Sequence, residues 1–171
     1  MRRALAALAL AALVAALGGC AGLGQGDQVD VIPSDERTPA PAFRVNALDG
    51  EGEVALTDYA GTPVILNFWA SWCEPCQREM PALVELSKER SDIQVVGLAV
   101  TDKPSASRAF AREMGADFPL GVDRHGDTIA KFGGTGLPTT VFIDREGRVA
   151  GTGFGELTAQ QFEGYADEIQ D

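Results

Sequence analysis

The sequence has few of the residues that disulfide scaffolds and metal centres require. Its 171 residues include three cysteines and one histidine. A small disulfide-stapled domain carries an even set of four or more cysteines, and a structural zinc site needs four ligands. The composition therefore excludes a disulfide scaffold and a histidine-rich metal site, and we expect no bound metal.

Positive charge is also scarce. Fourteen Lys and Arg residues stand against 25 Asp and Glu residues, which gives a formal net charge of −11. A surface this acidic repels phosphate backbones, so nucleic acid is not an expected partner. With 45% hydrophobic and 23% charged residues the composition is that of a folded protein, and the length corresponds to one domain with a tail.

The longest apolar run lies at the N-terminus. Arg2 and Arg3 precede an unbroken series of Ala, Leu and Val over residues 4–17. A positive start followed by a run of this length is typical of an export signal, whereas a membrane-spanning helix needs roughly 20 apolar residues. We therefore predict that residues 1–19 are a signal peptide. An uncleaved anchor helix is the alternative.

The apolar run ends in Leu17-Gly18-Gly19-Cys20. This sequence resembles the lipobox of bacterial lipoproteins, in which the cysteine thiol is acylated and becomes the first mature residue. The resemblance implies that Cys20 is a lipid anchor at the outer face of the bacterial cytoplasmic membrane. Ordinary cleavage near this position is the alternative, and it would leave Cys20 as a free thiol. In both cases the domain is exported into a compartment where disulfides persist.

Residues 20–42 are predicted to be a flexible tether. After Cys20 this segment is rich in Gly, Pro, Asp and Gln and has little apolar content. Such a composition is typical of a linker. The folded domain is then expected to occupy residues 43–171.

Beyond residue 43 the apolar pattern alternates between strand and helix periods. Short, nearly continuous apolar runs predict buried strands, and they cover residues 64–69, 93–100 and 139–143, with a turn and a partner strand from Arg148. Helical spacing predicts helices over residues 79–90, 104–114 and 158–170. This order predicts an α/β domain with a central mixed sheet and helices on both faces.

Two cysteines, Cys73 and Cys76, lie where the first of these strands gives way to a helix. A thiol at a helix N-terminus faces unpaired N–H groups and the positive end of the helix dipole, which stabilise the thiolate. A thiolate attacks disulfides, and a second thiol one turn along can then resolve the mixed disulfide. We predict that Cys73 attacks and Cys76 resolves. Pro75 suits the first turn of the helix.

Two other interpretations of the cysteine pair stay open. Half of a zinc site is one, but only Cys20 and the single histidine, His125, could add ligands. An inert structural disulfide is the other, although it does not require the flanking Trp69 and Trp72 or the strand-to-helix position. We expect Trp69 in the core and Trp72 over the active site, and no cofactor motif is present.

The segment Trp72-Cys73-Glu74-Pro75-Cys76 after an apolar strand resembles the thioredoxin motif. The longer stretch over residues 66–81 is similar to the TlpA/ResA branch of exported thiol–disulfide oxidoreductases, and the resemblance covers about residues 40–170. It implies a thioredoxin-like fold and dithiol–disulfide exchange at the cysteine pair, without a cofactor.

The resemblance also implies where substrates bind. Gly136-Leu137-Pro138 matches the segment that holds the family's cis-proline, which lies against the active-site disulfide and docks substrate backbone. Cis bonds are rare, so a cis Leu137–Pro138 bond is a specific expectation. The implied substrate-binding residues are Trp72, Glu74, Pro75, Leu137 and Pro138.

One departure separates the chain from cytoplasmic thioredoxin. Asn67 stands where thioredoxins have an aspartate that relays protons, whereas the TlpA/ResA branch keeps a glutamate three residues after the second cysteine, here Glu79. Cys76 must lose its proton to resolve a mixed disulfide. We therefore expect Glu79 to be a catalytic proton acceptor whose pKa is raised by partial burial. A solvated glutamate in an ion pair is the alternative.

By resemblance, the protein reduces disulfides of exported proteins, with apocytochrome c cysteines as a candidate target. Its electrons would come from a membrane thiol donor of the CcdA/DsbD type. A disulfide-forming oxidant or isomerase of the same fold is the first alternative. A Sco-like copper chaperone is less favoured because its cysteines are one residue further apart than Cys73 and Cys76. A thiol peroxidase would need a Thr-x-x-Cys spacing, which the sequence does not contain.

Overall fold

The computed structural model describes residues 29–170. Its strands are β1 (Val29–Val31), β2 (Thr38–Pro39), β3 (Arg44–Asn46), β4 (Glu53–Ala55), β5 (Val64–Trp69), β6 (Gln94–Val100), β7 (Leu120–Asp123), β8 (Thr139–Ile143) and β9 (Arg148–Phe154). Its helices are the 3₁₀ helix η1 (Leu56–Tyr59) and the α-helices α1 (Glu74–Glu89), α2 (Pro104–Met114), α3 (Asp127–Lys131) and α4 (Ala159–Glu168).

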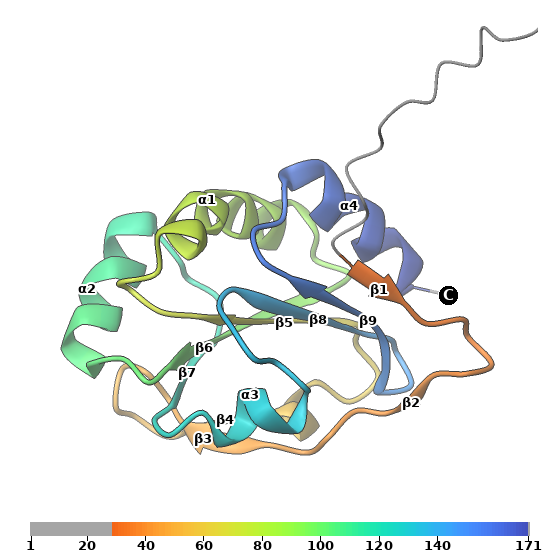
Figure 1. Ribbon diagram of the computed structural model, residues 1–171, viewed down its shortest axis with the longest axis horizontal. Helices are drawn as coiled ribbons and strands as arrows, with labels where there is room; N and C mark the ends of the chain where they lie inside the picture. Colours follow the sequence, from red (N-terminus) through yellow and green to blue (C-terminus); the bar gives the residue numbers. More distant parts are fainter. Residues whose placement is uncertain (1–28, 171) are drawn as a thin grey trace, which may run out of the picture.

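The main sheet has the strand order β1-β9-β8-β5-β6-β7, and β2 also pairs with β9. Strands β5, β6 and β7 are parallel, whereas β8 and β9 run antiparallel to their neighbours. Helices α1, α2 and α4 lie on one side of the sheet, and α3 lies on the other with the β3–β4 hairpin (Figure 1). The predicted α/β architecture, a mixed sheet with helices on both faces, is confirmed.

Strand β5 occupies the centre of the sheet, and all of its residues are buried. Successive side chains of a strand point to opposite faces. Ile65 and Trp69 accordingly join the apolar cluster beneath α1, α2 and α4, whereas Leu66 and Phe68 join the cluster on the α3 side. Asn67 lies between Leu66 and Phe68, so its side chain is on the same face as α1.

At the carboxyl end of β5, strands β5 and β9 end and the antiparallel strand β8 begins. Phe68 of β5 is paired with Thr139, and Thr139 is paired in turn with Phe154 at the end of β9. The loop after β5, the residue before β8 and the segment after β9 therefore meet at one edge of the sheet. This edge holds the candidate site.

One predicted element bound needs correction, and some elements were not predicted. The helix predicted over residues 79–90 begins five residues earlier, at Glu74, because Cys73 caps it and Pro75 is compatible with a first turn. Strands β3, β4 and β7, the 3₁₀ helix η1 and the short helix α3 were not predicted. Their apolar patterns are too short to show a period, and tertiary packing supports them.

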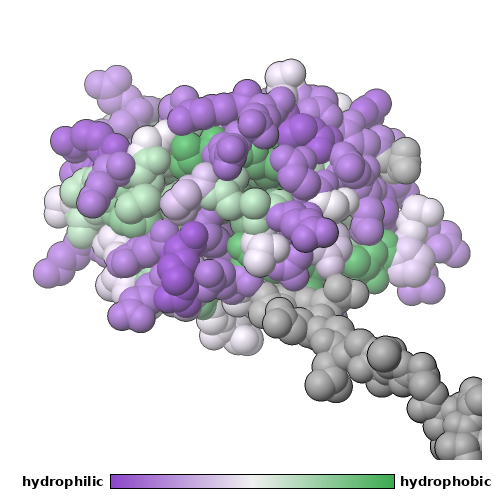
Figure 2. All heavy atoms as spheres, turned by 90° about the horizontal axis from the view of Figure 1, so that it is seen from above, coloured by the Kyte–Doolittle hydropathy of each residue, from purple (hydrophilic) through white to green (hydrophobic). Residues whose placement is uncertain are grey.

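The surface offers few large apolar side chains. Among residues 29–170, Val31, Trp72 and Phe154 are the exposed large hydrophobic residues. Figure 2 accordingly shows a mostly hydrophilic surface with small hydrophobic areas between. No helix in the described part of the chain is long and apolar enough to span a membrane.

The prediction of a flexible tether over residues 20–42 is wrong from Val29 onward. Strands β1 and β2 pair antiparallel with β9, and Val29 is buried against the sheet. Composition could not show this, because edge-strand pairing uses backbone groups that every residue carries. The predicted signal peptide, residues 1–19, and Cys20, the predicted site of lipid attachment, lie outside the described residues, as does the first part of the predicted tether.

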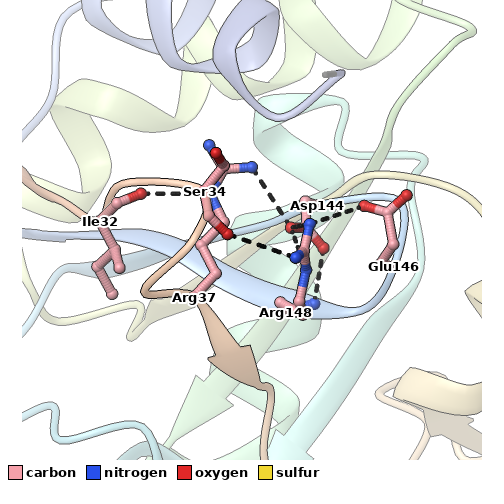
Figure 3. Close-up of polar contacts among 6 residues, drawn as sticks. All are labelled: Ile32, Ser34, Arg37, Asp144, Glu146 and Arg148. Atoms are coloured by element: carbon pink, nitrogen blue, oxygen red, sulfur yellow. Dashed lines mark hydrogen bonds and ion pairs between the residues drawn. The ribbon is translucent and has the colours of Figure 1, made fainter.

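A buried carboxylate fastens this N-terminal segment to the β8–β9 turn. Asp144 is fully buried and accepts hydrogen bonds from Arg37 Nη1 at 3.4 Å and from Arg148 Nε at 2.9 Å (Figure 3). Arg37 Nε also donates to the carbonyl of Ile32 at 3.2 Å. A buried charge needs such partners, so the fold of residues 29–42 is tied to that of β8 and β9.

Candidate active site

The cysteine pair lies at the N-terminus of α1, as predicted. Cys73 is the N-cap residue of α1, and its Sγ accepts a hydrogen bond from the backbone N–H of Cys76 at 3.3 Å. The two residues form a disulfide with an S–S distance of 2.11 Å and a Cα–Cα distance of 5.3 Å. Pro75 lies within the first turn, where its missing N–H is not needed.

The two cysteines differ in solvent exposure. Cys73 is 5% exposed and Cys76 is 0% exposed. An incoming disulfide therefore meets Cys73 first, while Cys76 is reached only from within the protein. This difference favours the predicted division into an attacking and a resolving cysteine.

The loop before Cys73 is held by an aspartate that the sequence did not single out. Asp102, between β6 and α2, accepts hydrogen bonds at Oδ2 from the backbone N–H of Ser71 and the hydroxyl of Ser107, both at 2.8 Å. Its Oδ1 accepts from the N–H of Lys103 at 2.7 Å. Burial acts to raise the pKa of Asp102, but these hydrogen bonds outweigh it and hold the pKa below its ordinary value.

The backbone next to Asp102 is strained. Thr101 has φ 46°, in the left-handed region that a β-branched residue rarely adopts. This conformation occurs directly before the aspartate that holds the active-site loop. No sequence motif marks either residue, because the contact joins segments 31 residues apart in the chain.

Glu79 lies on the buried face of α1, with a relative exposure of 2%. Its Oε1 accepts from Asn67 Nδ2 at 2.8 Å, and its Oε2 accepts from the backbone N–H of Leu157 at 3.1 Å. Burial raises the pKa of Glu79 to about 7; the hydrogen bonds from Leu157 and Asn67 oppose this rise, and the charge of Glu156 adds to it. The predicted burial is confirmed, and a solvated glutamate is ruled out.

Glu79 follows Cys76 by three residues on α1. Residues at this spacing are neighbours on one helix face, and both are buried. A carboxyl group with a pKa near neutrality is suited to exchange a proton with a thiol. The arrangement can therefore serve proton transfer at Cys76.

The predicted substrate-binding residues lie at the same edge of the sheet. Leu137–Pro138 is a cis peptide bond, as expected. Pro138 directly precedes β8, and its carbonyl accepts from the N–H of Gly155 at 2.9 Å. Trp72 and Glu74 are exposed beside Cys73, and Pro75 and Leu137 are half-buried.

A small cavity adjoins the cis-proline. It has a volume of about 170 Å³, and its lining includes Leu137, Pro138, Phe154 and Gly155. Sequence reasoning did not identify Phe154, because its position depends on the pairing of β8 with β9. A larger hollow of about 580 Å³ lies between α2 and the β3–β4 hairpin, and none of the predicted site residues lines it.

Within residues 29–170, no group of three or more His, Cys, Asp or Glu side chains could hold a metal ion. His125 is exposed in the turn between β7 and α3. Among the described residues, it forms no such group with the cysteine pair.

Comparisons with known proteins agree with this site. Residues 37–152 match the model of the AhpC/TSA family. The thiol-disulfide oxidoreductase ResA of Bacillus thuringiensis (strain Al Hakam) is 36% identical over 132 residues, which are 76% of this chain and 76% of the relative.

Two solved structures resemble the protein closely in fold. A DsbF homologue from Corynebacterium diphtheriae has a TM-score of 0.77 at 29% identity, with 85% of this chain and 96% of that chain covered. A secreted thiol-disulfide isomerase from Corynebacterium glutamicum has a TM-score of 0.77 at 26% identity, with 85% and 93% covered.

Proposed function

Because the chain belongs to the AhpC/TSA family and is a relative of the ResA thiol–disulfide oxidoreductases, we propose that it reduces disulfides of exported proteins at Cys73 and Cys76. It has the thioredoxin-like fold predicted from its sequence. The observation that carries the proposal is the disulfide at the N-terminus of α1, one helical turn from the buried Glu79.

The reaction begins with the reduced protein. The Cys73 thiolate attacks a substrate disulfide, forms a mixed disulfide and expels the first substrate sulfur as a thiolate. Cys76 then gives its proton to Glu79 and attacks the Cys73 sulfur. This step forms the Cys73–Cys76 disulfide and releases the second substrate sulfur. The substrate gains two electrons, and the protein is left oxidised until an external dithiol reduces it.

The helix and the buried carboxylate have separate tasks in this cycle. The N–H groups at the start of α1 stabilise negative charge on the Cys73 sulfur. Glu79, with a pKa of about 7 caused chiefly by burial, can take a proton at neutral pH and release it afterwards. Both sulfurs are thereby activated at the pH where exchange is needed.

Substrate polypeptide is proposed to bind at the edge that holds the disulfide. Trp72, Glu74 and Pro75 adjoin Cys73 in the chain, and Leu137 and Pro138 directly precede β8 at the same edge of the sheet. Trp72, with a relative exposure of 61%, offers a large apolar surface to a partner. An extended peptide could lie along residues 136–138 with its cysteine opposite Cys73.

The proposed location is the outer face of the bacterial cytoplasmic membrane. The related isomerase from Corynebacterium glutamicum is a secreted protein. The signal-like residues 1–19 and the lipobox-like Cys20 support export and lipid anchoring. A membrane thiol donor of the CcdA/DsbD type would then supply electrons, and apocytochrome c is a candidate substrate.

The same site could run in the opposite direction, as a disulfide-forming oxidant or an isomerase. The midpoint potential of the Cys73–Cys76 couple decides between these functions. Mature protein would be titrated against dithiothreitol or glutathione while Trp72 fluorescence is followed. A value of about −270 mV or lower supports a reductant, whereas about −120 to −180 mV indicates an oxidant or isomerase.

Two variants serve as controls for the redox titration. The Cys73→Ser and Cys76→Ser variants should show no fluorescence transition. A wild-type disulfide that cannot be titrated would make the pair structural and contradict the proposal.

Titration of the reduced protein with Cu(I) tests the copper-chaperone alternative, since a chaperone binds the metal tightly.

A further inference from the structure

Strand β5 contains one polar residue among five apolar ones, and it is fully enclosed. Asn67 has a relative exposure of 1%, and its Oδ1 is buried without a hydrogen-bond partner in the described part of the chain. A buried carbonyl without a hydrogen-bond partner destabilises the folded state. Packing alone would favour an apolar residue at this position. The side-chain NH₂ group of Asn67, which donates hydrogen bonds, must therefore account for the presence of asparagine.

The donor half of the amide is fully used. Asn67 Nδ2 donates to Glu79 Oε1 at 2.8 Å and to Thr140 Oγ1 at 3.0 Å. Thr140 has a relative exposure of 0% and is the residue of β8 directly opposite Asn67. Because the amide N–H groups diverge, the bond to Thr140 fixes the direction in which the other N–H points.

The Glu79 carboxylate is thus held from two elements. Asn67 of β5 binds Oε1, and the backbone of Leu157, before α4, binds Oε2. A carboxylate has about four acceptor positions, so capacity remains for a proton. The charged groups near Glu79 are Glu156 and Arg78, which form an exposed ion pair with each other. Arg78 Nε donates to Glu156 Oε2 at 2.7 Å.

We infer that Asn67, oriented by Thr140, is a positioning residue that stabilises the ionised form of Glu79. The inference rests on the proposed role of Glu79 as proton acceptor for Cys76. An amide that presents only N–H groups to a carboxyl favours its charged form, whereas burial and Glu156 favour its neutral form. Asn67 keeps the proton affinity of Glu79 low enough for the carboxyl to release its proton.

The test is a direct titration of Glu79 by carbon-13 NMR of its Cδ in the oxidised protein. In that state the disulfide cysteines do not titrate, so the curve belongs to Glu79 and its surroundings. The variants are Asn67→Leu, which removes the donor at similar volume, and Thr140→Val, which removes the hydroxyl that orients it. Thr128→Val, a buried threonine on α3, is the matched control.

Asn67→Leu should raise the midpoint of the Glu79 titration by about one pH unit, because one charge-assisted hydrogen bond is lost. Thr140→Val should raise it by less, and Thr140→Ser should restore it. Thr128→Val should leave it unchanged. An unaltered midpoint in folded Asn67→Leu and Thr140→Val proteins would show that the amide only fills space. If Asn67→Leu does not fold, the Thr140 variants decide alone.

A separate measurement tests the proposed function. The rate of disulfide exchange in Glu79→Gln reports whether Glu79 takes part in proton transfer. A rate equal to that of the wild type would contradict that role, whereas the NMR midpoints would still accept or reject the contact between Asn67 and Glu79.

Discussion

Glu79 and Leu157 join the active-site helix α1 to the segment that precedes the C-terminal helix α4. The backbone N–H of Leu157 donates to Glu79 Oε2 at 3.1 Å across 78 positions of the chain. The contact is buried, and Leu157 is itself part of the apolar core. The ionisation of Glu79 is therefore linked to the stability of the whole fold.

The first prediction concerns stability against pH. The pKa of Glu79 is about 7 in the folded protein, chiefly because of burial, against an ordinary value of 4.5. The folded state thus binds the proton more tightly, so this group destabilises the fold progressively as the pH rises from 4.5 to 7. The full loss is about 3 kcal/mol. Urea unfolding of the wild type and Glu79→Gln between pH 4.5 and 8 measures it.

Only the difference between the two proteins is diagnostic here, since other carboxyl groups titrate in both. Glu79→Gln should gain stability relative to the wild type as the pH rises through this window. A difference that stays constant with pH would mean that Glu79 has an ordinary pKa.

The second prediction concerns the rate of exchange. Glu79→Gln cannot accept the Cys76 proton, so the resolution of the mixed disulfide should slow by about 100-fold at neutral pH. Stopped-flow measurement with a model disulfide peptide gives the rate. Glu85→Gln, an exposed glutamate on the same helix, is the matched control and should keep the wild-type rate.

The third prediction concerns Asp102. Asp102→Ala leaves the N–H of Ser71 without its acceptor and the Ser107 hydroxyl with only the Lys103 carbonyl at 3.2 Å, so it should lower the free energy of unfolding by about 1–3 kcal/mol. It also removes a negative charge that is bound to Ser71, two residues before Cys73, so the thiolate should become more favourable and the midpoint potential less negative. Redox titration and urea unfolding measure both effects. The exposed Asp117→Ala should change neither.

The fourth prediction concerns the N-terminal strands. Arg37→Ala removes one of the two arginines that pair with the buried Asp144 and should destabilise the protein by about 1–3 kcal/mol. Limited proteolysis should then cut within residues 29–42. Arg44→Ala breaks an exposed pair with Glu53 and should cost under about 1 kcal/mol. If the wild type, Arg37→Ala and Arg44→Ala were equally resistant to protease, the contact between Arg37 and Asp144 would not hold the N-terminal strands in place.

The sequence was informative where the chemistry is concentrated in a short segment. The position of Cys73 and Cys76 at a helix start was predicted from a few adjacent residues, whereas the cis bond before Pro138 was implied by the family resemblance. The burial of Glu79 followed from family resemblance. Its partners Asn67 and Leu157 could not be derived, because they come from other elements and depend on the register of the sheet.

Residues 29–42 show the opposite case. Their composition is that of a linker, but they are structured because they pair with β9 through the backbone and because Arg37 binds the charged Asp144. Asp102 and Phe154 were missed for the same reason, since neither belongs to a local pattern. Contacts between distant segments leave no periodic trace in the sequence.

The start of β1 at Val29 leaves only a short linker between Cys20 and the folded domain. Residues 21–28 alone separate Cys20 from the folded domain, and fully extended they reach about 30 Å. For a chain lipidated at Cys20 as proposed, the disulfide would move in a thin layer above the bilayer, roughly one domain deep. Encounters with membrane partners would then be a two-dimensional search at high local concentration. Soluble targets would have to diffuse into this layer to be reduced.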